Sequence, residues 1–254
     1  FLIGFGLARL RISVSESRAI VREARRRYRR HNAGRRYVEN EFFSVLAASH
    51  HSQPDPNKVR YRLRRDPRVI AALERMWPVL TPAQLLRDLF GSKALIASAA
   101  AEHLPEEEWL TLFRPRGELL SDYRWSDADV PLLDEAYLGL GPRLDSRRKA
   151  RDPEVRTYGH IVIDETQDHT PMALRMISRR SLNGSMTVVG DIAQATAPGS
   201  AADWDEVLNY LPARVSEPRV RELTLSYRIP APNLELANKV LAVAAPELAP
   251  PKAV

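Results

Sequence analysis

Apolar residues recur at helical spacing through most of the first 155 residues. The segments with this spacing predict helices over residues 16–31, 36–50, 66–77, 81–91, 92–104, 105–115 and 125–141. Residues 8–14 alternate between apolar and polar instead, which predicts an edge strand, and Ser15 or Ser17 could cap the helix that follows. We therefore predict a mainly helical region with an N-terminal strand over residues 1–155.

Three features of the sequence mark where the predicted helices begin, end or are interrupted. Thr81 before Pro82 marks a helix start, and Gly91 marks its end. Pro54 and Pro56 predict a break in the chain. Residues 141–157 are polar without a clear period, and we expect them to form an exposed loop, which serves either as a probe or as a plain connection.

The pattern of apolar residues changes after residue 155, from helices alone to strands that alternate with helices. Strands are predicted over 158–165, 185–191 and 220–228, and helices over 170–180, 203–211 and 232–244. This alternation predicts βαβ units with a parallel sheet, an α/β fold class. The branched run Ile161, Val162 and Ile163 predicts a strand covered on both faces.

Composition and charge narrow the function classes. The net charge of +6 and the pI near 9.8 favour an anionic partner such as nucleic acid or nucleotide, and almost all of the 38 basic residues are arginines. The absence of cysteine excludes disulfides and thiolate metal sites and is typical of a reducing cytoplasm, where we expect the protein. No apolar run approaches the roughly 20 residues that span a bilayer, so no membrane partner is expected.

One predicted helix is unusually rich in arginine. In residues 16–31 only Val21, Ala24 and Tyr28 share an apolar face, and arginines occupy most of the remainder. Such a face either binds phosphates or a partner, or is simply solvated, and the sequence leaves both readings open.

Polar residues follow each of the three predicted strands after residue 155. They are Asp164, Glu165, Gln167 and Asp168 after the first, Gly190, Asp191 and Gln194 after the second, and Tyr227 and Arg228 after the third. Ligands of open parallel sheets bind at the carboxyl ends of the strands. Gly190 would let the backbone turn tightly there.

The residue types at these strand ends suit hydrolysis of a nucleoside triphosphate. A carboxylate such as Asp164 suits Mg²⁺, and the adjacent Glu165 can orient or deprotonate a water molecule. A glutamine at a neighbouring strand end can sense a phosphate without adding charge. An arginine such as Arg228 can neutralise charge on a transferring phosphoryl group.

The same stretches carry a family resemblance. DETQD, GDIAQ and LTLSYR resemble motifs II, III and IV of superfamily 1 helicases of the UvrD/Rep type, in order and in spacing, over about a third of the chain. A second resemblance is to the HelD-type ATPases, which bind bacterial RNA polymerase and release it from stalled or inactive complexes. It is carried by the segments RMWPVLTPAQLLRDLFGS, DVPLLDEA, YGHIVIDE and GDIAQAT. The resemblance implies a partial RecA-like P-loop NTPase core that takes ATP and Mg²⁺.

It also implies roles for the catalytic residues. Asp164 would hold Mg²⁺, and Glu165 would activate the attacking water. Gln194 would contact the γ-phosphate and couple hydrolysis to movement. Arg228 would act as an arginine finger, and Tyr227 would stack on the adenine.

Further residues are implied to support the nucleotide site. Gln167 and Asp168 would link it to the second motif, which contains Gly190 and Asp191. Residues 156–215 would form the last part of a first RecA-like domain, and residues 216–254 would begin a second, with a hinge near 212–220.

The sequence departs from the family pattern in three places. Thr166 replaces a small apolar or aromatic residue. The stretch ATAPGSAADW after Gln194 lacks the aromatic run that stacks on DNA bases, which disfavours strand unwinding. No G-x-x-x-x-G-K-[S/T] phosphate loop occurs, and Gly91-Ser92-Lys93 lacks the second glycine. We therefore expect an internal fragment of a longer protein that by itself binds ATP poorly and hydrolyses none.

Three functional readings follow. The leading one is a fragment of a superfamily 1 ATPase that remodels or releases bacterial RNA polymerase. The alternatives are an ATP-dependent DNA helicase of the UvrD/Rep type and a non-catalytic module that binds nucleic acid or polymerase. The six histidines show no metal-ligand spacing, so Mg²⁺ is the one metal expected, with Asp164 as its ligand.

Overall fold

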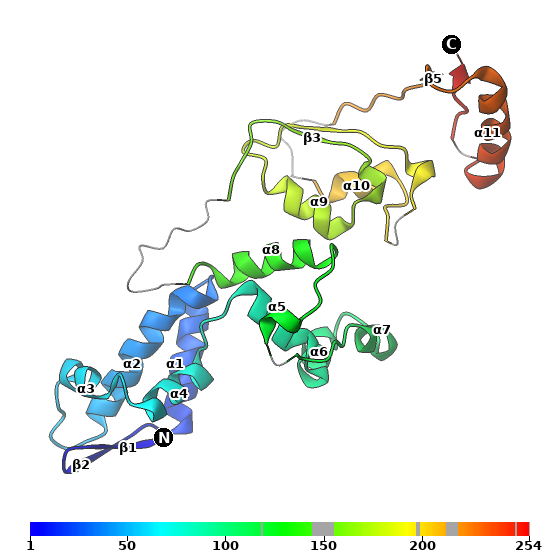
Figure 1. Ribbon diagram of the computed structural model, residues 1–254. Coiled ribbons are helices and arrows are strands. Elements are labelled where there is room, and N and C mark those ends of the chain that lie inside the picture. Colours follow the sequence, from blue (N-terminus) through cyan, green and yellow to red (C-terminus); the bar gives the residue numbers. More distant parts are fainter. Residues whose placement is uncertain (118, 144–154, 197–198, 212–217, 247, 254) are drawn as a thin grey trace. The chain divides into compact units, whose positions relative to one another are not determined.

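The computed structural model describes residues 1–117, 119–143, 155–196, 199–211, 218–246 and 248–253 (Figure 1). The chain divides into a first unit, Phe1–Glu154, and a second unit, Val155–Val254. This division falls beside the predicted boundary after residue 155, while a further division after residue 215 stays a prediction. Most of the predicted loop 141–157 and of the predicted hinge 212–220 lies outside the described residues.

The first unit is helix-rich and begins with a β-hairpin. Its elements are β1 (Leu2–Phe5), β2 (Ala8–Arg11), α1 (Val14–Arg27), the 3-10 turn η1 (His31–Gly34), α2 (Arg35–Ala48), α3 (Pro56–Leu63), α4 (Pro67–Met76), α5 (Pro82–Phe90), α6 (Lys93–Ala100), α7 (Glu106–Thr111), the 3-10 turn η2 (Leu120–Asp122) and α8 (Asp129–Leu140). All seven predicted helices are present, although α6 and α7 are shorter than predicted. Thr81 caps α5 in a capping box, as expected.

One local prediction for this unit is wrong, and one helix was not predicted. The chain breaks between α2 and α3 as expected, but Pro56 also begins the unpredicted α3, where Asp55 caps the helix and a missing N–H costs nothing at the first position. The cap of α1 is Ser13 rather than Ser15 or Ser17. The Ser13 hydroxyl accepts from Glu16 N at 3.2 Å, and the Glu16 carboxylate accepts from Ser13 N at 2.7 Å.

The predicted edge strand is one half of the hairpin. β1 and β2 pair antiparallel, with Ile3 opposite Leu10. Both side chains are buried because alternate residues of a strand face the same side. The apolar start of the chain therefore provides the partner strand for β2.

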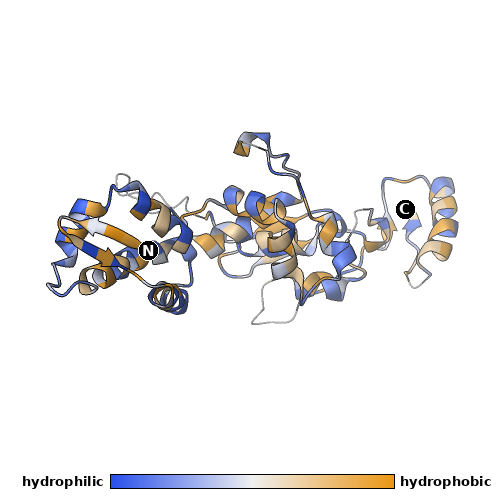
Figure 2. Ribbon diagram, turned by 90° about the horizontal axis from the view of Figure 1, so that it is seen from below, coloured by the Kyte–Doolittle hydropathy of each residue, from blue (hydrophilic) through white to orange (hydrophobic). Residues whose placement is uncertain are grey.

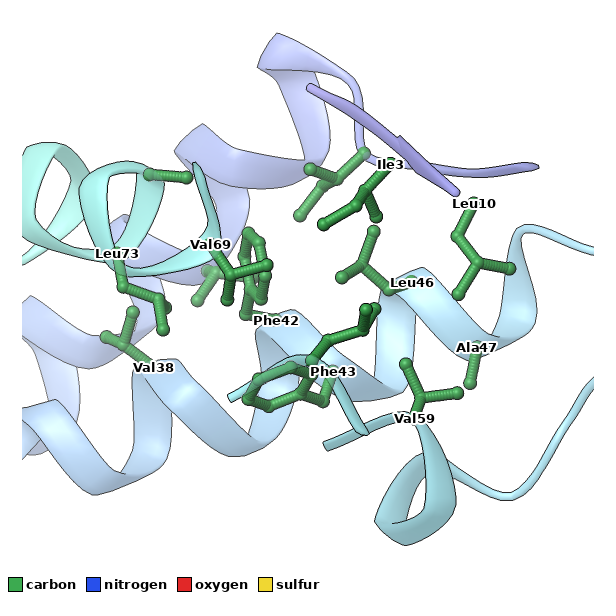
Figure 3. Close-up of a cluster of buried hydrophobic side chains, with 14 of the residues drawn as sticks. Ile3, Leu10, Val38, Phe42, Phe43, Leu46, Ala47, Val59, Val69 and Leu73 are labelled. Carbon is green, nitrogen blue, oxygen red and sulfur yellow. The ribbon is translucent and has the colours of Figure 1, made fainter. Parts of the chain in front are cut away.

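The core of the first unit surrounds α2. Phe42 and Leu46 are fully buried, and side chains from the hairpin, α3 and α4 point toward them in Figure 3. The labelled contributors are Ile3, Leu10, Val38, Phe42, Phe43, Leu46, Ala47, Val59, Val69 and Leu73. A smaller cluster of Leu86, Phe90 and Ala136 joins α5 to α8.

A buried ion pair supports this smaller cluster. Asp129 is fully buried, and its two carboxylate oxygens accept from the Arg114 guanidinium at 2.8 and 2.9 Å. Ser126 donates to the same carboxylate through its backbone N–H and its hydroxyl. Burial by itself would raise the pKa of Asp129, but the hydrogen bonds from Arg114 and Ser126 outweigh it and leave the pKa below its ordinary value.

The second unit contains the predicted alternation of strands and helices. Its elements are β3 (Ile161–Ile163), the 3-10 turn η3 (Thr166–Asp168), α9 (Pro171–Ser178), β4 (Met186–Val188), the 3-10 turn η4 (Ile192–Gln194), α10 (Trp204–Asn209), β5 (Leu225–Ser226), α11 (Ala231–Ala244) and β6 (Lys252–Ala253). β3 and β4 pair parallel, with Ile163 opposite Val188. This parallel pairing is compatible with the predicted α/β class, and each sheet in the described residues has two strands.

One sheet prediction needs correction, and the third strand lies in a sheet of its own. β5 pairs with β6 and not with β3 or β4, while the assignment of residues 216–254 to a second domain stays a prediction. The first strand is not covered on both faces, because Val162 is 66% exposed while Ile163 is buried. One face of β3 packs on the cluster of Leu174, Val207 and Leu211, and the alternate residue faces away from it.

Among the described residues, no helix combines the length and apolar character needed to cross a bilayer. The helices near the N-terminus carry both hydrophobic and hydrophilic positions in Figure 2. Their amphipathic pattern is that of helices that pack one face on a shared core.

We predict that Arg114→Leu lowers the free energy of unfolding of the first unit by about 3 kcal/mol or less, because a fully buried carboxylate loses its partner. The value is at the low end for such pairs since the Arg114 side chain is 35% exposed. Because the folded-state pKa of Asp129 is lowered, the stabilisation is present at neutral pH and is lost as the pH falls through that pKa. The measurement is urea unfolding by circular dichroism at neutral and acidic pH.

The matched control is Arg116→Leu. Arg116 pairs with Asp88 at 3.7 Å, and both side chains are substantially exposed. Its replacement should cost less than about 1 kcal/mol. Equal losses for the two variants would contradict a special contribution of the buried pair.

Candidate functional site

The predicted polar residues meet where β3 and β4 end. Because the two strands run parallel and in register, Asp164 and Glu165 leave the sheet beside Gly190 and Asp191. Val189 N donates to Ile163 O at 2.8 Å and continues the ladder to this edge. Side chains at this edge of a parallel sheet are in the usual position for binding ligands.

Gln167 joins the two strand ends. Its side chain is 2% exposed, and both ends of its amide are satisfied. Nε2 donates to Glu165 Oε2 at 2.7 Å, and Oε1 accepts from Asp191 N at 3.0 Å. These are linking contacts of the kind expected for Gln167, although its role toward a nucleotide stays a prediction.

Thr166 is the second buried polar residue of the site. It is 1% exposed, its N–H donates to Val189 O at 3.1 Å, and its hydroxyl donates to the same oxygen at 2.9 Å. Thr166, the residue that departs from the helicase pattern, therefore has a structural role, because it fixes the turn after β3 to the end of β4. The sequence carried no signal for this, because a threonine after a strand is equally compatible with solvent.

Position 190 requires a glycine because atoms of neighbouring residues lie where a Cβ atom would be. A Cβ atom at this position would lie 2.4 Å from Gln167 Oε1 and 3.0 Å from Thr166 N. The sequence predicted a glycine for a tight turn, but its φ is not positive. The missing side chain instead makes room for the Gln167 amide.

Glu165 has a strained backbone. Its φ is +48° and its ψ is 45°, the left-handed region that residues other than glycine rarely adopt. Such a conformation costs on the order of 1–3 kcal/mol and occurs preferentially at functional sites. The neighbouring Asp164 Oδ1 accepts from Glu165 N at 2.9 Å and supports the turn.

The remaining residues of this edge are tied into the same network. Asp191 Oδ2 accepts from Gln194 Nε2 at 2.7 Å, and Asp191 Oδ1 accepts from Ala193 N at 3.0 Å. Asp168 Oδ1 accepts from the N–H and the hydroxyl of Thr196, each at 3.3 Å. The structure therefore brings together all seven residues predicted at the first two strand ends.

Tyr227 and Arg228 are placed differently. They follow β5, which belongs to the other small sheet, and the Tyr227 side chain is 78% exposed. Among the described residues, neither side chain forms a hydrogen bond or an ion pair with the network around Gln167. Their assignments as adenine platform and arginine finger stay predictions.

Among the described residues, the carboxylates at this edge are too few to enclose a metal ion by themselves. Within the described part of the chain, no group of three or more Asp, Glu or His side chains could enclose an ion. A Mg²⁺ ion that arrives with a nucleoside triphosphate needs only one or two carboxylates, since phosphate and water supply the other ligands. The exposed Asp164 fits that requirement.

We predict that Gly190→Ala weakens the β3–β4 edge by about 1–3 kcal/mol, because the new methyl group collides with the Gln167 amide and with backbone. Gly159→Ala is the matched control, since a Cβ there meets nothing within 4 Å. Hydrogen exchange at the amides of Thr166 and Asp191 measures the effect. Equal protection in the two variants would show that Gly190 does not carry the packing of this edge.

No family model matches the chain, and no curated protein sequence matches it.

Proposed function

We propose that the chain belongs to an ATP-hydrolysing motor of superfamily 1, and that the β3–β4 edge is part of its nucleotide site in a partial RecA-like core. The observation that carries the proposal is the network at this edge. A buried amide, Gln167, connects the strained acid after one strand to the backbone after the next. The resemblance of DETQD and GDIAQ to motifs II and III supports the same assignment.

The geometry suits Glu165 as the group that takes a proton from water. Its Oε2 atom is anchored by the Gln167 amide at 2.7 Å. Its Oε1 atom has no hydrogen-bond partner among the described residues, so it is free to accept from a water molecule. When bound, ATP with Mg²⁺ supplies the phosphoanhydride bond, and Asp164 is the residue that would hold the ion.

The network also offers a route that couples phosphate contact at Gln194 to the position of Glu165. Gln194 bonds the Asp191 carboxylate, Asp191 N bonds the Gln167 amide, and Gln167 bonds Glu165. A displacement of Gln194 on contact with a phosphate would shift the anchor of the proposed base. Within this proposal, Tyr227 and Arg228 would reach the nucleotide from the second RecA-like domain.

We further propose bacterial RNA polymerase as the partner and the cytoplasm as the location. The support is the resemblance of short sequence segments in both units to HelD-type ATPases. The first unit has a core of its own, so it can serve as an arm carried by the motor. DNA is the competing partner, and the measurement below separates the two.

The test is Mg²⁺-dependent ATP turnover by the longest natural chain that contains this sequence. Glu165→Gln should lower turnover by about 10²–10⁴-fold, as loss of a general base does. Glu222→Gln, the same change at an exposed position of the second unit, should leave turnover unaltered. Equal turnover of the Glu165 variant and the wild type would refute the proposed base.

Turnover with added single-stranded DNA or RNA polymerase identifies the partner. Stimulation by polymerase, or ATP-dependent release of polymerase without a DNA effect, supports the proposed partner. Stimulation by DNA alone would make the protein a helicase and remove the polymerase assignment.

A further inference from the structure

The first unit carries a hollow between the hairpin and α3, far in sequence from the nucleotide site. The hollow has a volume of about 540 Å³ and is lined by Phe5, Asn57, Lys58, Tyr61 and Arg62. We call these residues, together with the adjoining Arg64 and Arg65, the hairpin–α3 surface. The hairpin and α3 lie near one another at one end of the unit (Figure 1).

Tyr61 is an aromatic residue on the outward side of α3. Val59 and Leu63 are buried in the core, and Tyr61 lies between them in sequence on the opposite side of the helix. Its side chain is 78% exposed. The Arg64 guanidinium lies 5.6 Å from the centre of its ring, and Arg62 lies 5.3 Å from the ring of Phe5.

The positive charge of this surface is uncompensated. Lys58, Arg62, Arg64 and Arg65 are exposed, and none of them forms an ion pair in the described part of the chain. No acidic residue occurs between Asp55 and Asp66. By contrast, Arg60 at the edge of the surface pairs with Glu39, and Arg68 pairs with Asp66.

Cations interleaved with an exposed ring are the combination that binds single-stranded nucleic acid. Lysine and arginine neutralise phosphates, and an exposed aromatic ring accepts an unpaired base by stacking. An acidic peptide without aromatic residues, such as polyglutamate, would use the cations but has no ring to stack on Tyr61. Duplex DNA keeps its bases paired, so their faces cannot reach the ring.

We propose that the hairpin–α3 surface binds single-stranded nucleic acid, with a base stacked on Tyr61 and phosphates on Lys58 and Arg62. This inference does not rest on the proposed ATPase function, because it concerns a different unit and needs no nucleotide.

The test measures binding of labelled oligothymidylate and oligouridylate to the whole chain by fluorescence anisotropy, without ATP. Tyr61→Leu should weaken binding about tenfold, and Tyr61→Trp should retain it, because a larger ring still stacks. Lys58→Gln with Arg62→Gln should reduce the slope of log affinity against log salt by about 1.4, since two phosphate contacts are lost. The stronger of the two oligonucleotides identifies DNA or RNA as the ligand.

The control for charge is Arg26→Gln with Arg68→Gln, which removes the same charge from arginines that are already paired with acids. This pair should leave binding nearly unchanged. Equal losses for both double variants, or wild-type affinity of Tyr61→Leu, would overturn the proposal. Binding of polyglutamate or duplex as tightly as the single strands would overturn it as well.

Discussion

The second unit depends on one buried amide. Gln167 is almost completely removed from solvent, so each end of its side chain must find a partner, and an unsatisfied group would cost about 1–3 kcal/mol. The partners it finds are the carboxylate of Glu165 and the backbone N–H of Asp191. The amide thereby fixes the distance between the two strand ends. It also explains Gly190, because any side chain there would occupy the position of its oxygen.

The same amide makes the strained turn at Glu165 tolerable. A left-handed glutamate is unfavourable by itself, but two hydrogen bonds hold this residue in place. Its carboxylate accepts from the Gln167 amide, and its backbone N–H donates to the Asp164 carboxylate. The Oε2 atom of Glu165 accepts the hydrogen bond from Gln167, and the Oε1 atom remains able to accept from a water molecule. The strain, the anchor and the unengaged oxygen are thus features of a single turn.

The sequence predicted features that depend on neighbouring residues and missed those that depend on distant ones. Thr81 and Thr170 begin helices as their local patterns indicate, and the polar residues after β3 and β4 do gather at one edge. The exposure of Val162 and the pairing of β5 with β6 depend on which segments pack on each sheet, which periodicity cannot report. Burial of Thr166 is equally invisible, since its hydroxyl is satisfied by a carbonyl in another strand.

The arginines of the first unit look alike in sequence but differ in their electrostatic surroundings. In α1, the Glu23 carboxylate accepts from Arg26 and Arg27, and these hydrogen bonds lower its pKa to about 2. The arginine-rich helix is therefore partly neutralised by its own acid. The cations around Tyr61 have no such acid, and they adjoin an exposed ring. Since charge attracts any anion but a ring selects an unpaired base, α3 rather than α1 has the means to recognise a single strand.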